Sequence, residues 1–257
     1  MSNAAGTGAE TAHARSTVDP AEVERFARLA EEWWNPNGKM AVLHRFNPVR
    51  LGWLREHVCA HFGRDPRALR PLSGLSILDI GCGGGLLSEP LARMGASVTG
   101  IEPAERNVRI AAAHAEGSGL DLTYRAVTAE DLADSGARFD VVLAMEVVEH
   151  VADVPLFLAR AGEMVKPGGL MAAATLNRTK RAFALAVVGA EYVLGWLPRG
   201  THDWRKFVTP EELSAALEAA GLTVLDRQGV VFNPLTNEWR RSSDMAVNYM
   251  MLAGRPG

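Results

Sequence analysis

Short apolar runs alternate with amphipathic stretches from about residue 75 onward, a pattern that predicts strands alternating with helices. The apolar runs predict strands at 76–80, 97–102, 121–125, 140–145 and 170–175. The stretches between them predict helices at 86–94, 104–116 and 153–165. This alternation is typical of an α/β protein with a doubly wound, mostly parallel sheet and helices on both faces.

The two ends of the chain carry different patterns. Near the N-terminus, apolar residues at helical spacing predict one helix over 19–34 and a second over 48–62. Beyond the alternation, a helix at 210–220 precedes two strands near 223–231 and 245–253. We expect these two strands to form an antiparallel pair at the edge of a seven-stranded sheet.

These patterns divide the chain into parts of different character. Residues 1–18 are small and polar, lack the apolar core of a signal peptide, and predict a disordered tail. Residues 19–74 predict a helical cap, and 75–257 predict the α/β domain. Within that domain, 178–206 is an insertion between the fifth strand and the next helix.

Composition narrows the function. A formal net charge of −3 and an isoelectric point near 6.2 argue against a general nucleic-acid binder. Two cysteines, Cys59 and Cys82, give neither a disulfide framework nor a metal-ligand cluster, so a reducing cytoplasm is expected. No apolar run is long enough to span a membrane.

A glycine-rich segment directly follows the first predicted strand. Asp79 lies near the end of that strand, and glycines recur at alternate positions 81, 83 and 85 before a helix. Such a segment brings bare backbone close to a ligand at a helix N-terminus. A dinucleotide-binding loop would need glycine where Leu86 stands, and Asp79 would repel its pyrophosphate. The segment is instead typical of methyltransferases that bind the cationic donor S-adenosylmethionine.

Two further positions are candidates for contacts to that nucleoside. Glu102 ends the second strand, about twenty residues beyond the loop, where an acid can accept both ribose hydroxyls. The alternative for Glu102 is a solvent-exposed acid at a strand end. Ala129 and Glu130 follow the third strand, where adenine contacts are common, although Thr128 is equally suited to start an ordinary helix.

Two carboxylates and an imidazole follow the fourth predicted strand. Glu146, Glu149 and His150 lie at the edge of the sheet where ligands bind. An oxygen-rich set with one histidine suits magnesium or manganese better than zinc. His150 could instead remove a proton from a phenolic acceptor, and a metal-bound imidazole cannot do both. The structural alternative is that Glu146 hydrogen-bonds the loop while His150 caps a helix.

The insertion at 178–206 is apolar and flanked by basic residues. Apolar side chains recur on one helical face at Phe183, Val187, Ala190, Leu194 and Leu197. Three interpretations are open: a lid over the site, a helix lying on a bilayer with its basic residues facing anionic lipid, or an ordinary core helix.

With these features together, the chain resembles the ubiquinone-biosynthesis O-methyltransferase family over about residues 20–253. Beyond the glycine motif, segments specific to that family occur at 33–34, 43–50, 145–150, 175–178, 187–192, 200–203 and 244–249. The resemblance implies a Rossmann-like class I methyltransferase fold. It also implies methylation of phenolic hydroxyls on polyprenyl catechol and demethylubiquinol intermediates, at both O-methylation steps.

The resemblance assigns roles to individual residues. It places S-adenosylmethionine contacts at Arg50, Gly81, Glu102 and Met145. With the loop and its neighbours, the expected donor site comprises Arg50, Asp79, Gly81, Cys82, Gly83, Glu102, Pro103, Ala129, Glu130 and Met145. It places Mg²⁺ ligands at Glu146, Glu149 and His150, and Glu149 and His150 are also the expected catalytic residues.

Substrates with lipid tails further imply peripheral association with an anionic membrane on its cytoplasmic side, and contact with other quinone-pathway enzymes. No nucleic-acid partner is expected. Two alternatives stay open at this point. One is a methyltransferase for another quinone or a soluble small molecule, and the other is a non-catalytic scaffold that binds lipid or partner enzymes.

Overall fold

The computed structural model describes residues 16–185 and 203–257. In this part of the chain, eight strands form one sheet in the order β3-β2-β1-β4-β5-β8-β6-β7. The strands are β1 (Ser76–Ile80), β2 (Ser97–Ile101), β3 (Leu122–Arg125), β4 (Phe139–Met145), β5 (Val165–Leu176), β6 (Thr223–Asn233), β7 (Glu238–Ser242) and β8 (Asn248–Gly254). The first five strands pair in parallel, as predicted, and β8 pairs antiparallel with both β5 and β6.

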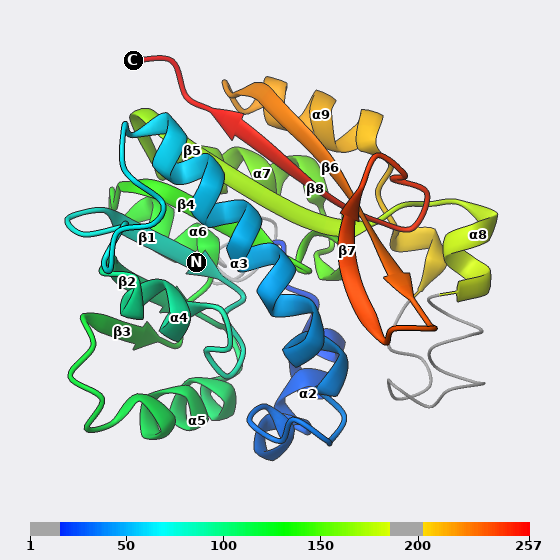
Figure 1. Cartoon of the computed structure of the whole chain (residues 1–257), viewed down its shortest axis with the longest axis horizontal. Helices are drawn as coiled ribbons and strands as arrows, with labels where there is room; N and C mark the ends of the chain where they lie inside the picture. Colours follow the sequence, from blue (N-terminus) through cyan, green and yellow to red (C-terminus); the bar gives the residue numbers. More distant parts are fainter. Residues whose placement is uncertain (1–15, 186–202) are drawn as a thin grey trace, which may run out of the picture.

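Helices cover both faces of this sheet, as Figure 1 shows. They are α2 (Pro20–Ala27), α3 (Ala41–His61), α4 (Ser88–Arg93), α5 (Glu105–Ala115), α6 (Ala129–Asp134), α7 (Val154–Glu163), α8 (Lys180–Ala182) and α9 (Pro210–Ala219). Short 3₁₀ turns are η1 (Ala30–Glu32), η2 (Val148–His150) and η4 (Trp204–Lys206). The start of α9 follows its sequence signal: Thr209 and Glu212 form a reciprocal capping box, which satisfies two orphan backbone donors.

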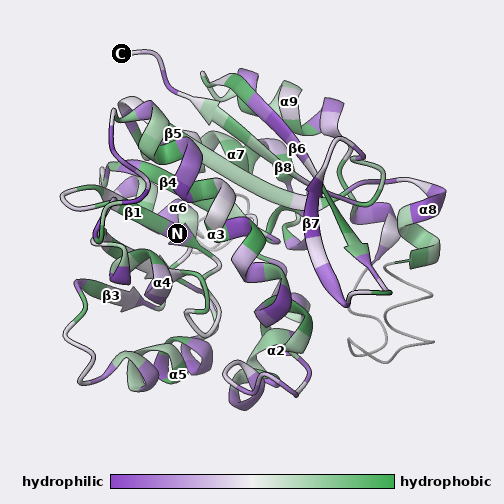
Figure 2. Ribbon diagram, in the orientation of Figure 1, coloured by the Kyte–Doolittle hydropathy of each residue, from purple (hydrophilic) through white to green (hydrophobic). Residues whose placement is uncertain are grey.

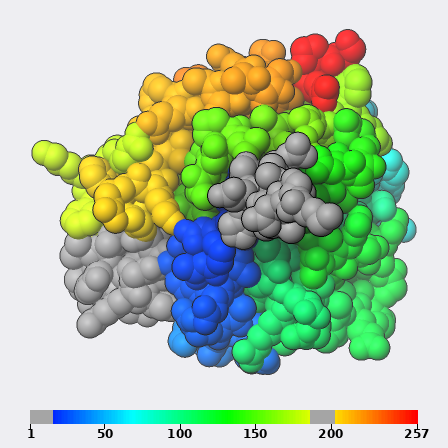
Figure 3. Space-filling model, turned by 180° about the vertical axis from the view of Figure 1, so that it is seen from behind, coloured from blue at the N-terminus to red at the C-terminus, as the bar shows by residue number. Residues whose placement is uncertain are grey.

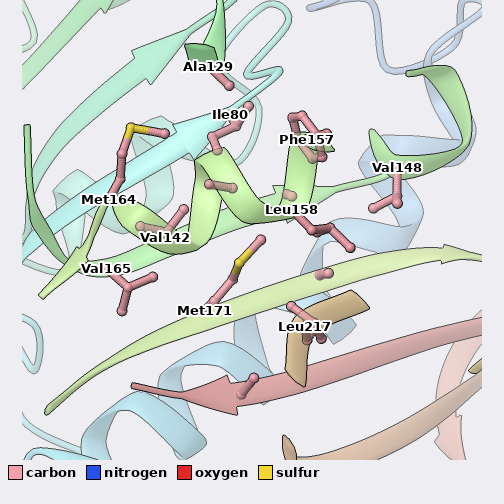
Figure 4. Packing of buried hydrophobic residues seen from close by; sticks show 14 of the residues in the cluster. Ile80, Ala129, Val142, Val148, Phe157, Leu158, Met164, Val165, Met171 and Leu217 are labelled. Carbon is pink, nitrogen blue, oxygen red and sulfur yellow. The ribbon is translucent and has the colours of Figure 1, made fainter. Parts of the chain in front are cut away.

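Two hydrophobic cores lie on opposite faces of the sheet. On one face, Leu158 of α7 and Leu217 of α9 pack on β4 and β5, where Val142 and Met171 are fully buried (Figure 4). On the other face, Trp53 of α3 anchors the second core. Because both faces are covered, the central strands are apolar along most of their length, which Figure 2 shows as green ribbon.

The N-terminal helices differ from the prediction. The first helix ends at Ala27 and is followed by the 3₁₀ turn η1, rather than running to Trp34. The second begins at Ala41, so that Pro48 lies inside it rather than at its start. Proline removes one helical hydrogen bond, and buried Phe46 and Trp53 on either side hold the helix in place despite that loss.

The C-terminal half contains one strand more than expected. After Asn233, β6 turns back as β7, and Asn237 adopts a left-handed φ of 56° in that turn. The ring of Trp239 in β7 lies 4.8 Å from that of Phe46, so the hairpin is folded over α3. The antiparallel pairing of β6 with β8 was predicted, but β8 lies inside the sheet and the β6–β7 hairpin forms its edge.

The predicted tail and insertion are only partly within the described residues. Thr17 is buried and Val18 is half-buried and bridges to Val151, so the described structure begins before the predicted helix. Of the apolar face predicted in the insertion, Phe183 is described and half-exposed. The remaining positions, Val187, Ala190, Leu194 and Leu197, lie outside the described residues. In the described ranges, no helix combines the length and apolarity needed to cross a bilayer.

Candidate active site

A cavity of about 810 Å³ opens at the carboxyl ends of β1, β2 and β4. Helices α2 and α3 cover it on one side, and the β6–β7 hairpin forms another wall. Figure 3 shows the N-terminal segment, in blue, lying across the molecule on the face opposite to that of Figure 1. A cavity of this size suits a nucleoside and a second small molecule.

Most residues expected to form the site line this cavity. They are Arg50, Asp79, Gly81, Cys82, Glu102, Pro103, Met145, Glu146, Glu149 and His150. Gly83, Ala129 and Glu130 are not among the lining residues. Glu130 instead accepts hydrogen bonds from the amide and hydroxyl of Thr17 at 3.0 and 2.5 Å. Its expected contact to adenine therefore stays a prediction.

The glycine loop has a backbone conformation that requires glycine at alternate positions. The alternate residues Gly81, Gly83 and Gly85 have φ values of 67°, 53° and 87°, a region that side chains other than glycine rarely adopt. The loop is held from the next strand, because the amides of Gly81 and Cys82 both donate to the carbonyl of Ile101. The loop is thus a rigid wall of the cavity.

Two buried acids hold the loop and face the cavity. The carboxylate of Glu102 accepts hydrogen bonds from the amides of Gly83 at 3.3 Å and Ala104 at 3.0 Å. Asp79 accepts one from Ser88 Oγ at 2.5 Å. Burial raises the pKa of Asp79 to about 6, against the opposing effects of Ser88 and Arg50. An ammonium group placed beside Asp79 would compensate this burial.

Trp33 and Trp34 pack against the glycine loop rather than in a distant core. The indole nitrogen of Trp34 donates to the carbonyl of Gly84 at 2.8 Å, and that of Trp33 donates to Asn107 at 3.1 Å. A Cβ atom on Gly83 or Gly84 would overlap with the Trp33 ring. The N-terminal cap thereby contributes directly to the donor side of the site.

Arg50 is the buried cation of the site. It lies on α3, and one guanidinium nitrogen donates to Asn47. Burial lowers its pKa, while the charges of Glu146, Asp79 and Glu149 act in the opposite direction. Within the described residues its Nε makes no hydrogen bond, so it can still receive the carboxylate of a ligand.

Glu149 is a buried carboxyl in a strongly acidic environment. Its Oε2 accepts a hydrogen bond of 2.7 Å from Thr175, while its Oε1 is buried and accepts none from the described residues. Burial and the charge of Glu146 raise its pKa to about 8. Glu146 itself has a left-handed φ of 61°, a strained backbone conformation that is concentrated at functional sites.

The same carboxylates allow a test of whether a divalent cation fits. The unused Oε1 of Glu149 and the repulsion from Glu146 suit a cation in charge and burial. His150, the third expected ligand, has its Nδ1 3.0 Å from Glu22 Oε2 of α2. Over 16–185 and 203–257, no three potential ligand side chains are arranged to hold a metal ion.

Sequence reasoning missed several residues of the site. Glu22 resembled an ordinary acid in the first turn of a helix, and Thr175 a buried strand residue. Trp33 and Thr175 lie in the family-specific segments 33–34 and 175–178, but their contacts with the glycine loop and with Glu149 were not predicted. Glu22 carries no local signal, because it reaches the cavity only through the packing of α2.

Comparisons with known proteins agree with this geometry. Residues 55–227 match a family model described as a methyltransferase domain. Two curated relatives share the name ubiquinone biosynthesis O-methyltransferase. The Methylobacterium nodulans protein is 63% identical over 93% of this chain and 96% of its own length. The Chelativorans protein is 62% identical over 94% and 96% respectively.

Solved structures share the fold at low sequence identity. A Burkholderia thailandensis 1,6-didemethyltoxoflavin-N1-methyltransferase has a TM-score of 0.59 at 18% identity, covering 100% of this chain and 94% of that one. A Synechocystis magnesium protoporphyrin IX methyltransferase has a TM-score of 0.54 at 21% identity, with coverages of 80% and 84%. These neighbours confirm the predicted class of fold.

Proposed function

This chain belongs to the ubiquinone biosynthesis O-methyltransferase family, and from that membership we propose that it transfers a methyl group from S-adenosylmethionine to a phenolic oxygen of polyprenylated ubiquinone precursors. The observation that carries the proposal is that two groups of residues line the same cavity. One group is the glycine loop with Glu102, and the other is the acidic cluster with His150.

The donor side suits a cationic aminoacyl nucleoside. Glu102 would accept the ribose hydroxyls, and Asp79 would face the amino group, because both acids line the cavity. Arg50 would bind the carboxylate of the same ligand, because it is the buried cation of this wall. Both ends of the methionine moiety thus meet a group of opposite charge.

Transfer breaks the bond between the methyl carbon and the sulfonium sulfur and forms a bond from that carbon to the acceptor oxygen. S-adenosylhomocysteine leaves, and the proton of the acceptor hydroxyl must pass to a base. Where His150 does not bind a metal ion, it can accept this proton, because it lines the cavity and an imidazole is a suitable base for a phenol. Alignment of the two ligands in the cavity further lowers the barrier to transfer.

We also propose Mg²⁺ beside the acceptor. The two carboxylates Glu146 and Glu149 would hold it, with His150 as the third ligand in the family's pattern. When bound, the ion would lower the pKa of the acceptor hydroxyl. Support comes from the buried, unused Oε1 of Glu149 and from its repulsion by Glu146.

We also propose that the protein associates peripherally with the cytoplasmic side of an anionic membrane, because the proposed substrate carries a lipid tail. Support comes from exposed apolar side chains near the cavity. Leu185 lines the cavity and is 52% exposed, and Phe183 is 45% exposed. Leu235 lies in the turn of the β6–β7 hairpin, next to the lining residue Pro234, and is 94% exposed. Contact with other quinone-pathway enzymes would use the same rim.

Product analysis tests the reaction. The chain is treated with chelator and incubated with S-adenosylmethionine and a short-tailed demethylated quinol, with and without added Mg²⁺. Mass spectrometry and NMR of the product should show a methyl group on oxygen, formed faster with Mg²⁺. A methyl group on ring carbon would overturn the O-methyltransferase assignment. Equal rates with and without Mg²⁺ would overturn the proposed metal site and leave the O-methyltransferase assignment standing.

Calorimetry separates an enzyme from a scaffold. The full chain should release or absorb heat when titrated with S-adenosylmethionine, and an Arg50→Met variant should bind it at least about tenfold more weakly. A chain that shows no heat with the donor and forms no product would be a lipid- or partner-binding scaffold instead.

A further inference from the structure

Helix α2 brings one carboxylate to the imidazole of His150. Glu22 Oε2 lies 3.0 Å from His150 Nδ1, although the two residues are 128 positions apart. Both side chains line the cavity, and their exposed fractions are only 17% and 13%. The ring of Phe26, one turn further along α2, meets the imidazole edge-on at 5.0 Å between centroids.

Backbone contacts before α2 and after His150 hold Glu22 and His150 together. Before α2, Thr17 donates to Glu130 twice, and its carbonyl accepts the amide of Ala152. The bridge between Val18 and Val151 then places the start of α2 directly beside the residue that follows His150. Glu22 is therefore held in register with His150 by backbone contacts as well as by its own side chain.

Cationic side chains surround the carboxylate of Glu22. Arg25 donates to it from the same helix. Lys206 Nζ lies 3.8 Å from Glu22 Oε1 and 2.9 Å from Asp19 Oδ2. A half-buried carboxylate that stays charged is a strong hydrogen-bond acceptor.

We propose that Glu22 is a positioning residue for His150: its carboxylate accepts the Nδ1 proton and so leaves Nε2 as the unprotonated nitrogen. The inference rests on the proposed methyl transfer. An Nε2 lone pair is required whether His150 takes the proton of the acceptor hydroxyl or binds a metal ion, because both need a neutral ring with a free nitrogen. The N-terminal cap, which is outside the methyl-donor motif, thereby enters the acceptor chemistry.

Arg25 offers the competing arrangement. Its Nη2 lies 3.3 Å from the same Nδ1, and an N–H donated there would reverse the tautomer. The same nitrogen also donates to Glu22 Oε2. The carboxylate of Glu22 is closer to Nδ1 than the guanidinium of Arg25 is, and its negative charge attracts an N–H group. Donation from Nδ1 to Glu22 is therefore favoured.

The test uses NMR of the full chain with ¹⁵N-labelled histidine. Seven histidines give seven sets of signals, and the His150 set is the one lost in a His150→Gln variant. The wild-type protein should show His150 protonated at Nδ1. That signature should disappear in Glu22→Gln and return at least partly in Glu22→Asp. Glu24→Gln is the matched control, because Glu24 lies on the same helix but is 76% exposed and contacts Arg28.

Turnover gives an independent measure. Glu22→Gln should lower kcat by about 10- to 100-fold, with the KM for the acceptor and the Kd for S-adenosylmethionine within about twofold of wild type. Glu22→Asp should recover part of kcat, and Glu24→Gln should leave it unchanged. A wild-type His150 protonated at Nε2 would overturn the inference, and so would a Glu22→Gln variant that changes KM alone. If the wild type forms no methylated product, the proposed function fails, while the NMR comparison still decides the tautomer.

Discussion

The indole ring of Trp33 covers Gly83 so closely that no side chain fits between them. Trp33 belongs to the N-terminal cap, whereas Gly83 belongs to the loop that follows β1. The contact means that the cap and the donor loop are one structural unit, although 50 residues separate them in the chain. Donor affinity should therefore respond to changes on either side of this contact.

A Gly83→Ala variant should lose donor binding. Its Cβ would overlap with Trp33, and its φ of 53° would be strained for alanine. We expect the Kd for S-adenosylmethionine, measured by calorimetry, to rise at least about tenfold. Gly117→Ala is the control: it has a φ of 73° but no atom within 4 Å of the added Cβ. Equal loss of affinity in both variants would argue against a specific role of the contact between Gly83 and Trp33.

The free energy of unfolding should decrease as the pH is raised from 4.5 to 8, because of the Glu149 carboxyl group. Its pKa rises from 4.5 to about 8 on folding, so the folded chain keeps a proton that the unfolded chain releases. The free energy of unfolding then decreases as pH increases across that window. In chelator and without donor, Glu149→Gln should raise the free energy of unfolding at pH 8 by up to about 5 kcal/mol, because the slope across that window is about 1.4 kcal/mol per pH unit. Urea denaturation at pH 5 and pH 8 measures this, and an unchanged pH slope in the variant would contradict it.

Removal of the Glu149 carboxyl group should lower turnover and leave donor binding unchanged. Glu149→Ala is expected to bind S-adenosylmethionine within about twofold of wild type but to lower kcat by about 100-fold or more. Glu56→Ala serves as the control, because Glu56 is a half-exposed carboxylate paired with Arg241 on the surface. Near-normal turnover of Glu149→Ala would remove Glu149 from both the catalytic and the metal roles.

Membrane binding should depend on the tip of the β6–β7 hairpin. Leu235→Ser should weaken binding to vesicles containing anionic lipid by about tenfold, since burying a leucine is worth about 1.5–3 kcal/mol. Leu69→Ser is a matched control, because Leu69 is 93% exposed in the connector between α3 and β1, away from the cavity lining. Sedimentation with vesicles compares the two. Equal effects of both changes would argue against a specific membrane face.

Most of the fold could be predicted from the sequence, because strands and turns are marked by local residue patterns. The five parallel strands and the left-handed glycines at 81, 83 and 85 follow from apolar runs and spacing. The family was confirmed by the comparisons. In contrast, α3 begins seven residues before Pro48, since burial of Phe46 on the cavity side outweighs the proline signal. The β7 strand was missed because it is short and half-exposed.

The site was predictable where a motif defines it and not where packing does. Asp79, Glu102 and the acidic cluster after β4 follow strand ends, and the doubly wound topology brings strand ends together. Glu22 reaches the same cavity only through the docking of α2, and no residue pattern near it marks it as functional. Thr175 lies in the family-specific segment 175–178, but its hydrogen bond to Glu149 depends on the packing of β5 beside β4.

The position of β8 between β5 and β6 has a consequence for synthesis on the ribosome. The β6–β7 hairpin is made first, but among the described strands its only other neighbour in the sheet is β8, the last of them to emerge. Until Asn248–Gly254 is available, the hairpin cannot join the sheet. Val231 and Phe232 of that hairpin are part of the cavity wall. A nascent chain therefore completes its donor loop early and closes its binding cavity last, so an unfinished chain cannot enclose a substrate.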